Sequence, residues 1–232
     1  NDITVGTLTW SGGAIAGAGK LTTTGISTLS GTSAKYLSNK VWDNSGTVNL
    51  TGRLYLDDTD TATPATAIFN NLSGGIVNVN SVQSNPISYR YSYNDLSEEF
   101  NNAGTLNWNS SYSTWGYSDI HYITFNNTGT VNLNSGLRLY YTGGDDAGAY
   151  NIAANQTLQF FGYDRTLDAG GVLAGSGSFL GTFTNAGGTI RPGGQGTVGS
   201  LTITGDLNQT SGVIEIDIQS NGAGTPVAGT DH

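Results

Sequence analysis

Gly46-Thr47-Val48-Asn49-Leu50 is the stretch that decides the fold, because the chain repeats it in nearly the same form. The further copies are Gly75-Ile76-Val77-Asn78-Val79, Gly104-Thr105-Leu106-Asn107-Trp108 and Gly129-Thr130-Val131-Asn132-Leu133. Degenerate copies follow at 188–192, a distance that we interpret as two coils, and at 212–216. Repeats every 20–50 residues are typical of solenoids, in which units that cannot bury their apolar face alone stack into a common core.

Alternation within each copy predicts which side chains face inward. Successive residues of a strand point to opposite faces, so in-register copies place their apolar residues in two internal columns. These columns are Val48, Val77, Leu106 and Val131, and Leu50, Val79, Trp108 and Leu133. The asparagines between them form an external row whose amides can bond as a ladder. This structural ladder comprises Asn49, Asn78, Asn107 and Asn132.

The residues before each copy also recur. An aromatic residue and an asparagine precede the glycine, as in Trp42-Asp43-Asn44 and Phe100-Asn101-Asn102. We expect the glycine to mark a corner that needs positive φ or close backbone approach. The asparagine before it can tolerate the left-handed conformation, and its amide can bond along a ladder of equivalents.

These patterns predict an all-β chain, a single right-handed parallel β-helix over residues 1–232 with coils of about 22–30 residues. No stretch has the period of an amphipathic helix. Residues 1–40 are interpreted as further rungs rather than a separate domain. Roughly nine coils at ~4.8 Å per rung predict a rod of about 45 Å.

Composition excludes several classes of partner. The net charge is −9 and no basic run occurs, so nucleic acid and anionic membrane surfaces are expected to be repelled. No apolar run approaches the ~20 residues of a membrane span. The chain has no cysteine, which excludes disulfides and thiolate metal sites.

Catalytic and metal-binding candidates are few. Asp57, Asp58 and Asp60, with Arg53 nearby, and the pair Asp145-Asp146 are interpreted as solvated turns, although such turns could also bind calcium. No second acidic pair or basic residue recurs at coil spacing to complete a catalytic site. His121 is expected to be an ordinary, partly exposed side chain. We therefore predict no catalytic residues, no metal, no cofactor and no enzymatic activity.

Aromatic residues supply the candidate ligand-binding site. It comprises Tyr89, Tyr91, Tyr93, Trp115 and Tyr117. Tyrosines mixed with serine, glycine and asparagine suit adaptable binding surfaces and sugars, although packing between rungs is the competing interpretation. A second register, Tyr91, Tyr117, Tyr141 and Tyr163, predicts an aromatic column.

The last third of the chain carries a family resemblance. Gly187-Gly188-Thr189-Ile190-Arg191-Pro192-Gly193-Gly194 leads through Gln195-Gly196-Thr197 into Leu201-Thr202-Ile203-Thr204-Gly205. This run resembles a signature of autotransporter passenger domains and related β-strand-repeat, haemagglutinin-like adhesins of bacterial surfaces. The resemblance implies a secreted rod, located outside the cell or on the bacterial outer surface, of which this chain is a fragment.

The expected function is therefore structural and adhesive. We predict a rod that presents surfaces to glycans or to a host or neighbouring cell. Without caps, its ends expose strand edges that favour end-to-end self-association into filaments. The alternative function is a carbohydrate-binding or polysaccharide-cleaving β-helix.

Overall fold

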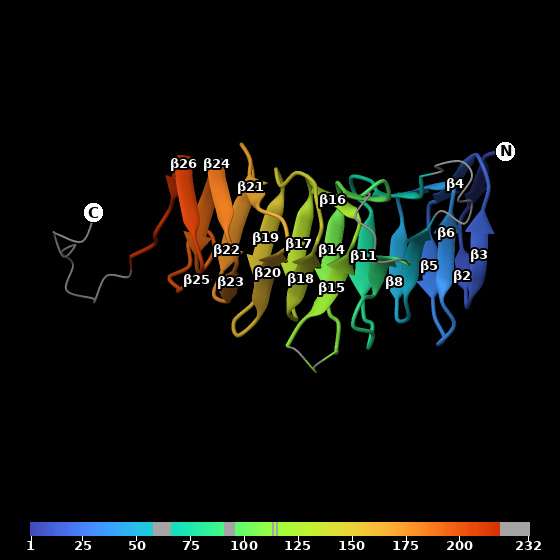
Figure 1. Ribbon diagram of the computed structural model, residues 1–232, viewed down its shortest axis with the longest axis horizontal. Coiled ribbons are helices and arrows are strands. Elements are labelled where there is room, and N and C mark those ends of the chain that lie inside the picture. Colours follow the sequence, from blue (N-terminus) through green and yellow to red (C-terminus); the bar gives the residue numbers. More distant parts are fainter. Residues whose placement is uncertain (58–65, 91–95, 113, 115, 219–232) are drawn as a thin grey trace.

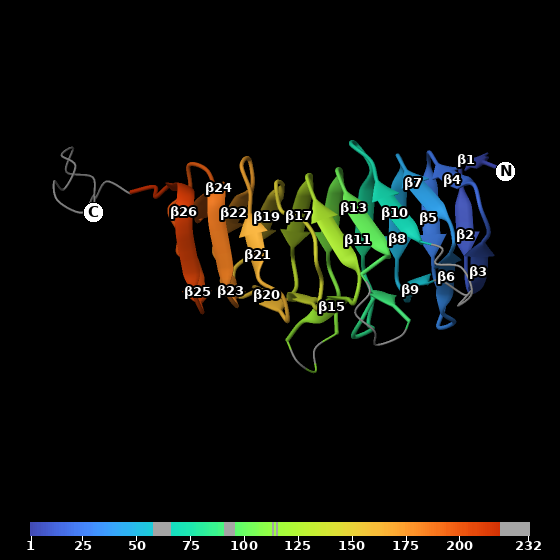
Figure 2. The ribbon, with the colours of Figure 1, turned by 45° about the horizontal axis from the view of Figure 1, so that its top comes forward.

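The chain forms a parallel β-solenoid in which three sheets wrap around one core. The structure, a computed structural model, describes residues 1–57, 66–90, 96–112, 114 and 116–218. Figures 1 and 2 show a rod whose strands lie side by side along its long axis, from the amino-terminal to the carboxy-terminal end. These residues contain 26 strands and no helix. The described part of the chain therefore has no helix that could cross a membrane. The predicted fold class is confirmed.

Each complete coil contributes one strand to each of three faces, which we call sheets 1, 2 and 3. Sheet 1 contains β1 (Ile3–Val5), β4 (Lys20–Thr23), β7 (Val41–Asn44), β10 (Ile68–Asn71), β13 (Glu99–Asn102) and β16 (Thr124–Asn127). Sheet 2 contains β2 (Leu8–Trp10), β5 (Ile26–Leu29), β8 (Thr47–Leu50), β11 (Ile76–Val79), β14 (Thr105–Trp108), β17 (Thr130–Leu133), β19 (Ala149–Ile152) and β22 (Val172–Gly175). It continues into β24 (Phe183–Pro192), which pairs with β21 (Arg165–Leu167) and β26 (Leu207–Ile214).

Sheet 3 forms the remaining face of the rod. Its strands are β3 (Gly13–Ala16), β6 (Lys35–Ser38), β9 (Leu54–Asp57), β12 (Ile87–Tyr89), β15 (Ser118–His121), β18 (Leu137–Tyr140), β20 (Thr157–Phe161), β23 (Ser178–Leu180) and β25 (Thr202–Thr204). These nine strands agree with the expected number of coils.

The repeated stretch builds sheet 2 as its alternation predicts. Val48 pairs with Val77, Val77 with Leu106, and Leu106 with Val131. The two internal columns of this sheet are at most 1 % exposed. Their burial removes apolar surface from water along the whole stack, which is the main stabilising contribution in such a fold.

The aromatic and asparagine residues before each repeat form strands of their own, in sheet 1. Trp42, Phe69 and Phe100 are fully buried, with ring centroids 4.5 Å and 5.0 Å apart. The asparagines that end these strands have no positive φ, so they do not use the left-handed conformation that asparagine tolerates. The expected ladder of equivalents is confirmed, because their amides bond in series, each carboxamide being able to donate to one neighbour and accept from another.

We call this series the inner ladder, and all its members are buried. Asn44 Nδ2 donates to Asn71 Oδ1 at 2.9 Å, and Asn71 Nδ2 to Asn102 Oδ1 at 2.8 Å. Asn102 Nδ2 donates in turn to Asn127 Oδ1 at 2.9 Å. The ladder therefore satisfies polar groups that would otherwise be costly inside the rod.

The glycines at the start of the repeats are required by close approach rather than by φ. Gly104 and Gly129 do not have positive φ. A Cβ added to Gly104 would lie 2.2 Å from the carbonyl oxygen of Gly75, and one added to Gly129 would lie 2.2 Å from that of Gly104. Any side chain here would collide with the backbone of the preceding coil.

Coil length varies more than the sequence predicts. The separation is 31 residues between Asn71 and Asn102 but only 19 between Asn132 and Asn151. The shorter coils also correct the interpretation of the degenerate copy at 188–192. Strands β19 and β22 lie between it and β17, so it follows three coils after the last regular copy, not two.

The inner ladder stops at Asp146, which does not lie in a solvated turn as the sequence suggested. The backbone of Asp146 forms parallel β-bridges with Asn127 and with Leu167, and the residue is 1 % exposed. Arg165 donates to both its carboxylate oxygens, at 2.7 Å and 2.8 Å, and Tyr150 donates its hydroxyl to the same carboxylate. Other Arg165 N–H groups donate to the carbonyls of Phe125, Thr142 and Gly143. We call Asp146, Tyr150 and Arg165 the buried ion cluster.

Asp57 also departs from the turn interpretation. It ends β9 and is fully buried, whereas Asp58 and Asp60 lie outside the described residues. Arg53 donates to the hydroxyl of Tyr55 at 2.8 Å, and it donates to no acidic side chain among the residues that the structure describes. Among the described residues, no three His, Asp or Glu side chains gather as a metal site would require.

Candidate functional site

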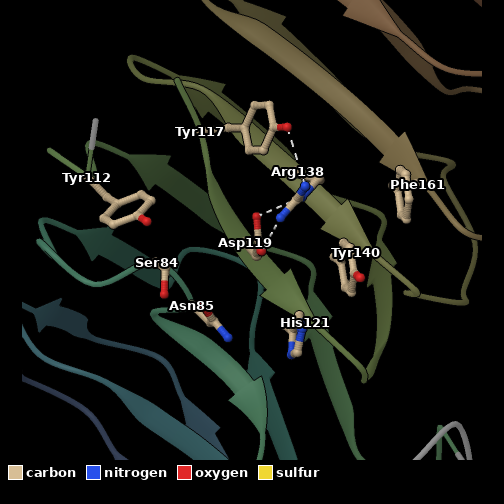
Figure 3. A pocket seen from close by; sticks show the side chains of 9 residues that line it. All are labelled: Ser84, Asn85, Tyr112, Tyr117, Asp119, His121, Arg138, Tyr140 and Phe161. Atoms are coloured by element: carbon tan, nitrogen blue, oxygen red, sulfur yellow. Dashed lines mark hydrogen bonds and ion pairs between the residues drawn. The ribbon is translucent and has the colours of Figure 1, made fainter. Parts of the chain in front are cut away.

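The outer face of sheet 3 carries a groove with a cavity volume of about 570 Å³. Its lining combines aromatic rings with one acidic and one basic side chain, as Figure 3 shows. The lining residues are Ser84, Asn85, Tyr112, Tyr117, Asp119, His121, Arg138, Tyr140 and Phe161. They come from four successive coils, and we call this site the sheet 3 groove.

Strand alternation places the polar residues in this groove. In β15 and β18, Ile120 and Leu139 point into the core and are at most 1 % exposed. Their neighbours Asp119 and Arg138 therefore point outward. Asp119 pairs with Arg138 in the register of the sheet, which brings two residues that are 19 apart in sequence into contact.

Arg138 and Asp119 form a bidentate ion pair. Arg138 Nε and Nη2 donate to the two Asp119 carboxylate oxygens at 3.0 Å and 2.8 Å. Burial raises the pKa of the Asp119 carboxyl, and the hydrogen bonds and charge of Arg138 oppose that rise. Burial acts to lower the pKa of Arg138, but the bonds to Asp119 and its charge leave that pKa raised. The guanidinium is thus charged and fixed in one orientation.

Aromatic rings hold the same guanidinium from the sides. The Arg138 Cζ lies 4.5 Å from the ring centroid of Tyr117 and 4.6 Å from that of Tyr140. Arg138 Nη1 also donates to the Tyr117 hydroxyl at 3.3 Å. These cation–π contacts and the ion pair make the groove floor rigid before any ligand arrives.

A column of stacked rings runs along the rod beside this ion pair. The centroids of His121 and Tyr140 lie 4.9 Å apart, and those of Tyr140 and Phe161 lie 5.0 Å apart. The ring planes are within 13° of parallel in both pairs. Most of the ring faces therefore contact one another, and the ring edges border the groove.

His121 is neutral in this setting. Burial, with the positive charges of Arg138 and Arg53, lowers the pKa of His121 to about 4. Its Nδ1 is buried and has no hydrogen-bond partner among the described residues. A buried N–H without an acceptor is costly, so we assign the proton to Nε2, which leaves an unpaired acceptor at Nδ1.

Tyr112, Ser84 and Asn85 lie on the other side of the groove from Asp119 and Arg138 in Figure 3. The carbonyl of Ser84 accepts from the Asp119 backbone N–H at 2.7 Å, which ties this side to β15. The Tyr112 ring stacks on no aromatic ring or cation of the described chain, unlike Tyr117 and Tyr140.

Of the residues predicted as a ligand-binding site, the structure describes two, and one of them lies in this groove. Tyr117 lines it, but Tyr89 is 8 % exposed and belongs to the core. Tyr91, Tyr93 and Trp115 lie outside the described residues. Of the aromatic column predicted from tyrosine spacing, Tyr141 and Tyr163 are in contact, with ring centroids 5.9 Å apart. Tyr117 does not join them, because it precedes β15 while Tyr141 follows β18, and Tyr91 lies outside the described residues.

Sequence reasoning missed most of the groove because its residues are up to three coils apart. Asp119, Arg138, Tyr140 and Phe161 belong to strands whose pairing depends on coil lengths that vary. The useful signal was the alternation of Asp119 with His121 and of Arg138 with Tyr140. Both pairs flank an apolar residue in a short strand.

The external asparagines of sheet 2 are linked by hydrogen bonds in series. Asn78 Nδ2 donates to Asn49 Oδ1 at 2.9 Å, Asn107 to Asn78 at 2.8 Å, and Asn132 to Asn107 at 2.9 Å. Asn151 extends this outer ladder by donating to Asn132. All five side chains are partly or fully exposed, so water competes for their hydrogen bonds.

A second, more open hollow of about 420 Å³ lies at the end of the outer ladder. It is lined by Asn132, Asn134, Asn151 and small residues, with no ring and no charge. The sheet 3 groove is the stronger candidate, because aromatic and charged groups together provide both contact area and orientation.

The chemistry of the sheet 3 groove suits binding. Glycoside hydrolysis ordinarily needs two carboxyl groups across the scissile bond. The lining holds one, Asp119, and both of its oxygens accept from Arg138. Aromatic surfaces with fixed polar groups are what a sugar requires of a binding site.

Comparison with protein-family models, with curated proteins and with solved structures found no match to this chain. The class of protein is accordingly defined by the fold itself, a parallel β-solenoid.

Proposed function

We propose that this chain is an adhesive β-solenoid rod that binds glycans through the sheet 3 groove. The observation that carries the proposal is Arg138, held between the Asp119 carboxylate and the rings of Tyr117 and Tyr140. A fixed fork of donors beside aromatic surface binds hydroxyl-rich ligands without ordering the site first. The rod acts by presentation, and the groove binds glycans without cleaving them.

The proposed setting is the outside of a bacterial cell. The resemblance of residues 187–205 to autotransporter passengers and haemagglutinin-like adhesins supports it. So does a low content of charged residues, 11 %, with polarity supplied by asparagine, threonine and glycine. The partner would be the glycans of a host or neighbouring cell.

A glycan array tests this function directly. The double variant Tyr112→Ala, Tyr117→Ala removes two rings of the groove, and we expect it to lose at least 90 % of the specific signal of the unaltered protein. Tyr36→Ala is the matched control, since Tyr36 also lies on sheet 3 but stacks on Tyr55 away from the groove. Absence of any specific glycan signal from the unaltered protein, with circular dichroism showing β structure, would refute the function.

End-to-end association is a second property that we propose for the rod. The edge of β26 facing away from β24 pairs with no strand of the described chain. Ile214 pairs with buried Ile190 but is itself 49 % exposed. An exposed edge with apolar side chains templates further pairing.

Light scattering against protein concentration tests this association. We expect the unaltered chain to form larger species as concentration rises and Ile214→Lys to stay monomeric. A monomer of constant mass across the same range in the unaltered chain would reject end-to-end association and leave glycan binding unaffected.

A further inference from the structure

The sheet 3 groove is electrically balanced, and this limits the ligands it can take. Its lining contains one positive and one negative side chain, in direct contact, and a neutral imidazole. A carboxylate or sulfate on a sugar would have to compete with Asp119 for Arg138. It would also lie near the Asp119 charge in a partly desolvated site. The groove therefore favours sugars without charge.

The lining of the groove extends along the rod axis over four coils. His121 pairs with Tyr140, and Tyr140 with Phe161, in the register of sheet 3. Ser84 and Asn85 precede β12, one coil earlier. Four coils are separated by three steps of about 4.8 Å, or about 14 Å in all, which is roughly the distance from the first to the last ring of four linked pyranoses in an extended chain.

The polar and aromatic groups are arranged for such a chain. Arg138 Nη1 has a second N–H beside the one given to Tyr117, and each Asp119 oxygen keeps a lone pair. These groups and His121 Nε2–H offer donors and acceptors to ring hydroxyls. The Tyr112 ring offers a flat apolar face on the opposite side of the groove.

We propose that the ligand is a neutral, extended, equatorially linked polysaccharide segment that lies parallel to the rod axis, with about one sugar on each coil. Because successive sugars in such a chain advance by about the rung spacing, each would meet the side chains of one coil. This inference rests on the proposed glycan-binding function and adds the charge, length and direction of the ligand.

The test is calorimetry with two matched series of oligosaccharides. The neutral probes are β-1,4-linked glucose and mannose oligomers of one to six units, and the acidic probes are the corresponding β-1,4-linked glucuronic and mannuronic acid oligomers. We expect affinity to rise at least tenfold from one unit to three or four and then to level off. We expect each acidic trimer to bind at least tenfold more weakly than its neutral counterpart.

Two variants locate the chain along the rod. Phe161→Ala removes the ring at one end of the groove, so it should weaken binding of the tetramer but leave the dimer within twofold. Tyr112→Ala should weaken every neutral probe at least tenfold, and Tyr36→Ala should change none. Thermal unfolding followed by circular dichroism checks that each variant is folded.

The possible outcomes distinguish failure of this inference from failure of the proposed glycan-binding function. Tighter binding of acidic oligomers, or equal affinity for one unit and six, would overturn the inference while glycan binding stands. Binding only to glycans outside these β-1,4-linked series on the array would also overturn it. Failure of the unaltered protein to bind any glycan would overturn both.

Discussion

The inner ladder and the buried ion cluster occupy successive positions of the same stack, yet they satisfy buried polarity in different ways. From Asn44 to Asn127 each carboxamide accepts from one neighbour and donates to the next. At the following coil Asp146 takes this position and is neutralised by Arg165, whose five N–H groups all meet oxygen atoms.

The difference shows which kind of buried polar side chain can recur at the same position in successive coils. A carboxamide presents one donor and one acceptor along the axis, so each coil leaves the same requirement for the next. A carboxylate only accepts and a guanidinium only donates, so their pair closes on itself. The amide ladder can extend through any number of coils, whereas the ion cluster ends it.

Removing one partner of the ion cluster should give the largest effect. Asp146→Ala leaves the Arg165 charge buried without compensation, so we expect the free energy of unfolding to fall by about 3–5 kcal/mol. Urea denaturation followed by circular dichroism measures the loss. The double variant Asp146→Leu, Arg165→Met removes both charges and should recover part of it, because the Tyr150 hydroxyl and the carbonyls that accept from Arg165 still lose their partners. A loss below about 1 kcal/mol in Asp146→Ala would contradict the assigned role.

Interrupting the inner ladder should cost less, because no charge is stranded. Asn102→Ala removes the acceptor for Asn71 and the donor to Asn127 in a fully buried setting. We expect a loss of about 2–3 kcal/mol in the same urea measurement. A loss as large as that of Asp146→Ala would erase the distinction between the two regions.

Acidification sharpens the comparison in another way, since carboxamides do not titrate but His121 does. Its pKa is about 4 in the folded chain, against about 6.5 when unfolded, so the unfolded state binds more protons between these values. Stability from this group is full above about pH 6.5 and falls as pH drops toward 4.

The measurement is the free energy of unfolding at several pH values for the unaltered chain and His121→Gln. We expect the unaltered chain to lose more stability across this window than the variant. The difference should be smaller than the loss in Asn102→Ala, because the ring is partly exposed. Parallel pH profiles for the two proteins would show that His121 is not the titrating group.

The outer ladder should give the smallest effect. Asn107 bonds to Asn78 and Asn132 in the same manner as Asn102 bonds to its neighbours, but it is partly exposed. Water can replace the lost bonds, so Asn107→Ala should cost only about 0.5–1 kcal/mol. Equal losses in Asn102→Ala and Asn107→Ala would mean that burial does not separate the two ladders.

The repeat made the fold predictable where coils are regular. Val48, Leu50 and their equivalents could be placed inside because strand alternation allows only two faces. The sheet 1 strand of each coil, at Trp42 and its equivalents, was not recognised as a strand from the sequence. Its asparagine was placed at a corner because asparagine favours turns, although the ladder that its amide forms was expected. In the structure this asparagine ends a strand and is buried in a stacked row.

The candidate site was less predictable because it depends on register between coils of unequal length. Asp119 and Arg138 could be paired only by knowing that their coil is short. Asp146 was misjudged for the same reason, since its partner Arg165 lies one variable coil away. A sequence pattern shows which side chains of a strand face inward. Which residue of the next coil lies beside them depends on the length of the loops between the strands.

The parallel pairing of strands between coils has a mechanical consequence. Backbone hydrogen bonds between coils point along the rod, so tension applied at its ends pulls on them lengthwise. Coils stacked in series all carry the same tension, and the end coils of this stack yield first because each is held by a neighbouring coil on one side only. The sheet 3 groove spans β12 to β20, in the middle of the nine strands of its sheet. A bound partner would therefore be released only after the flanking coils had yielded.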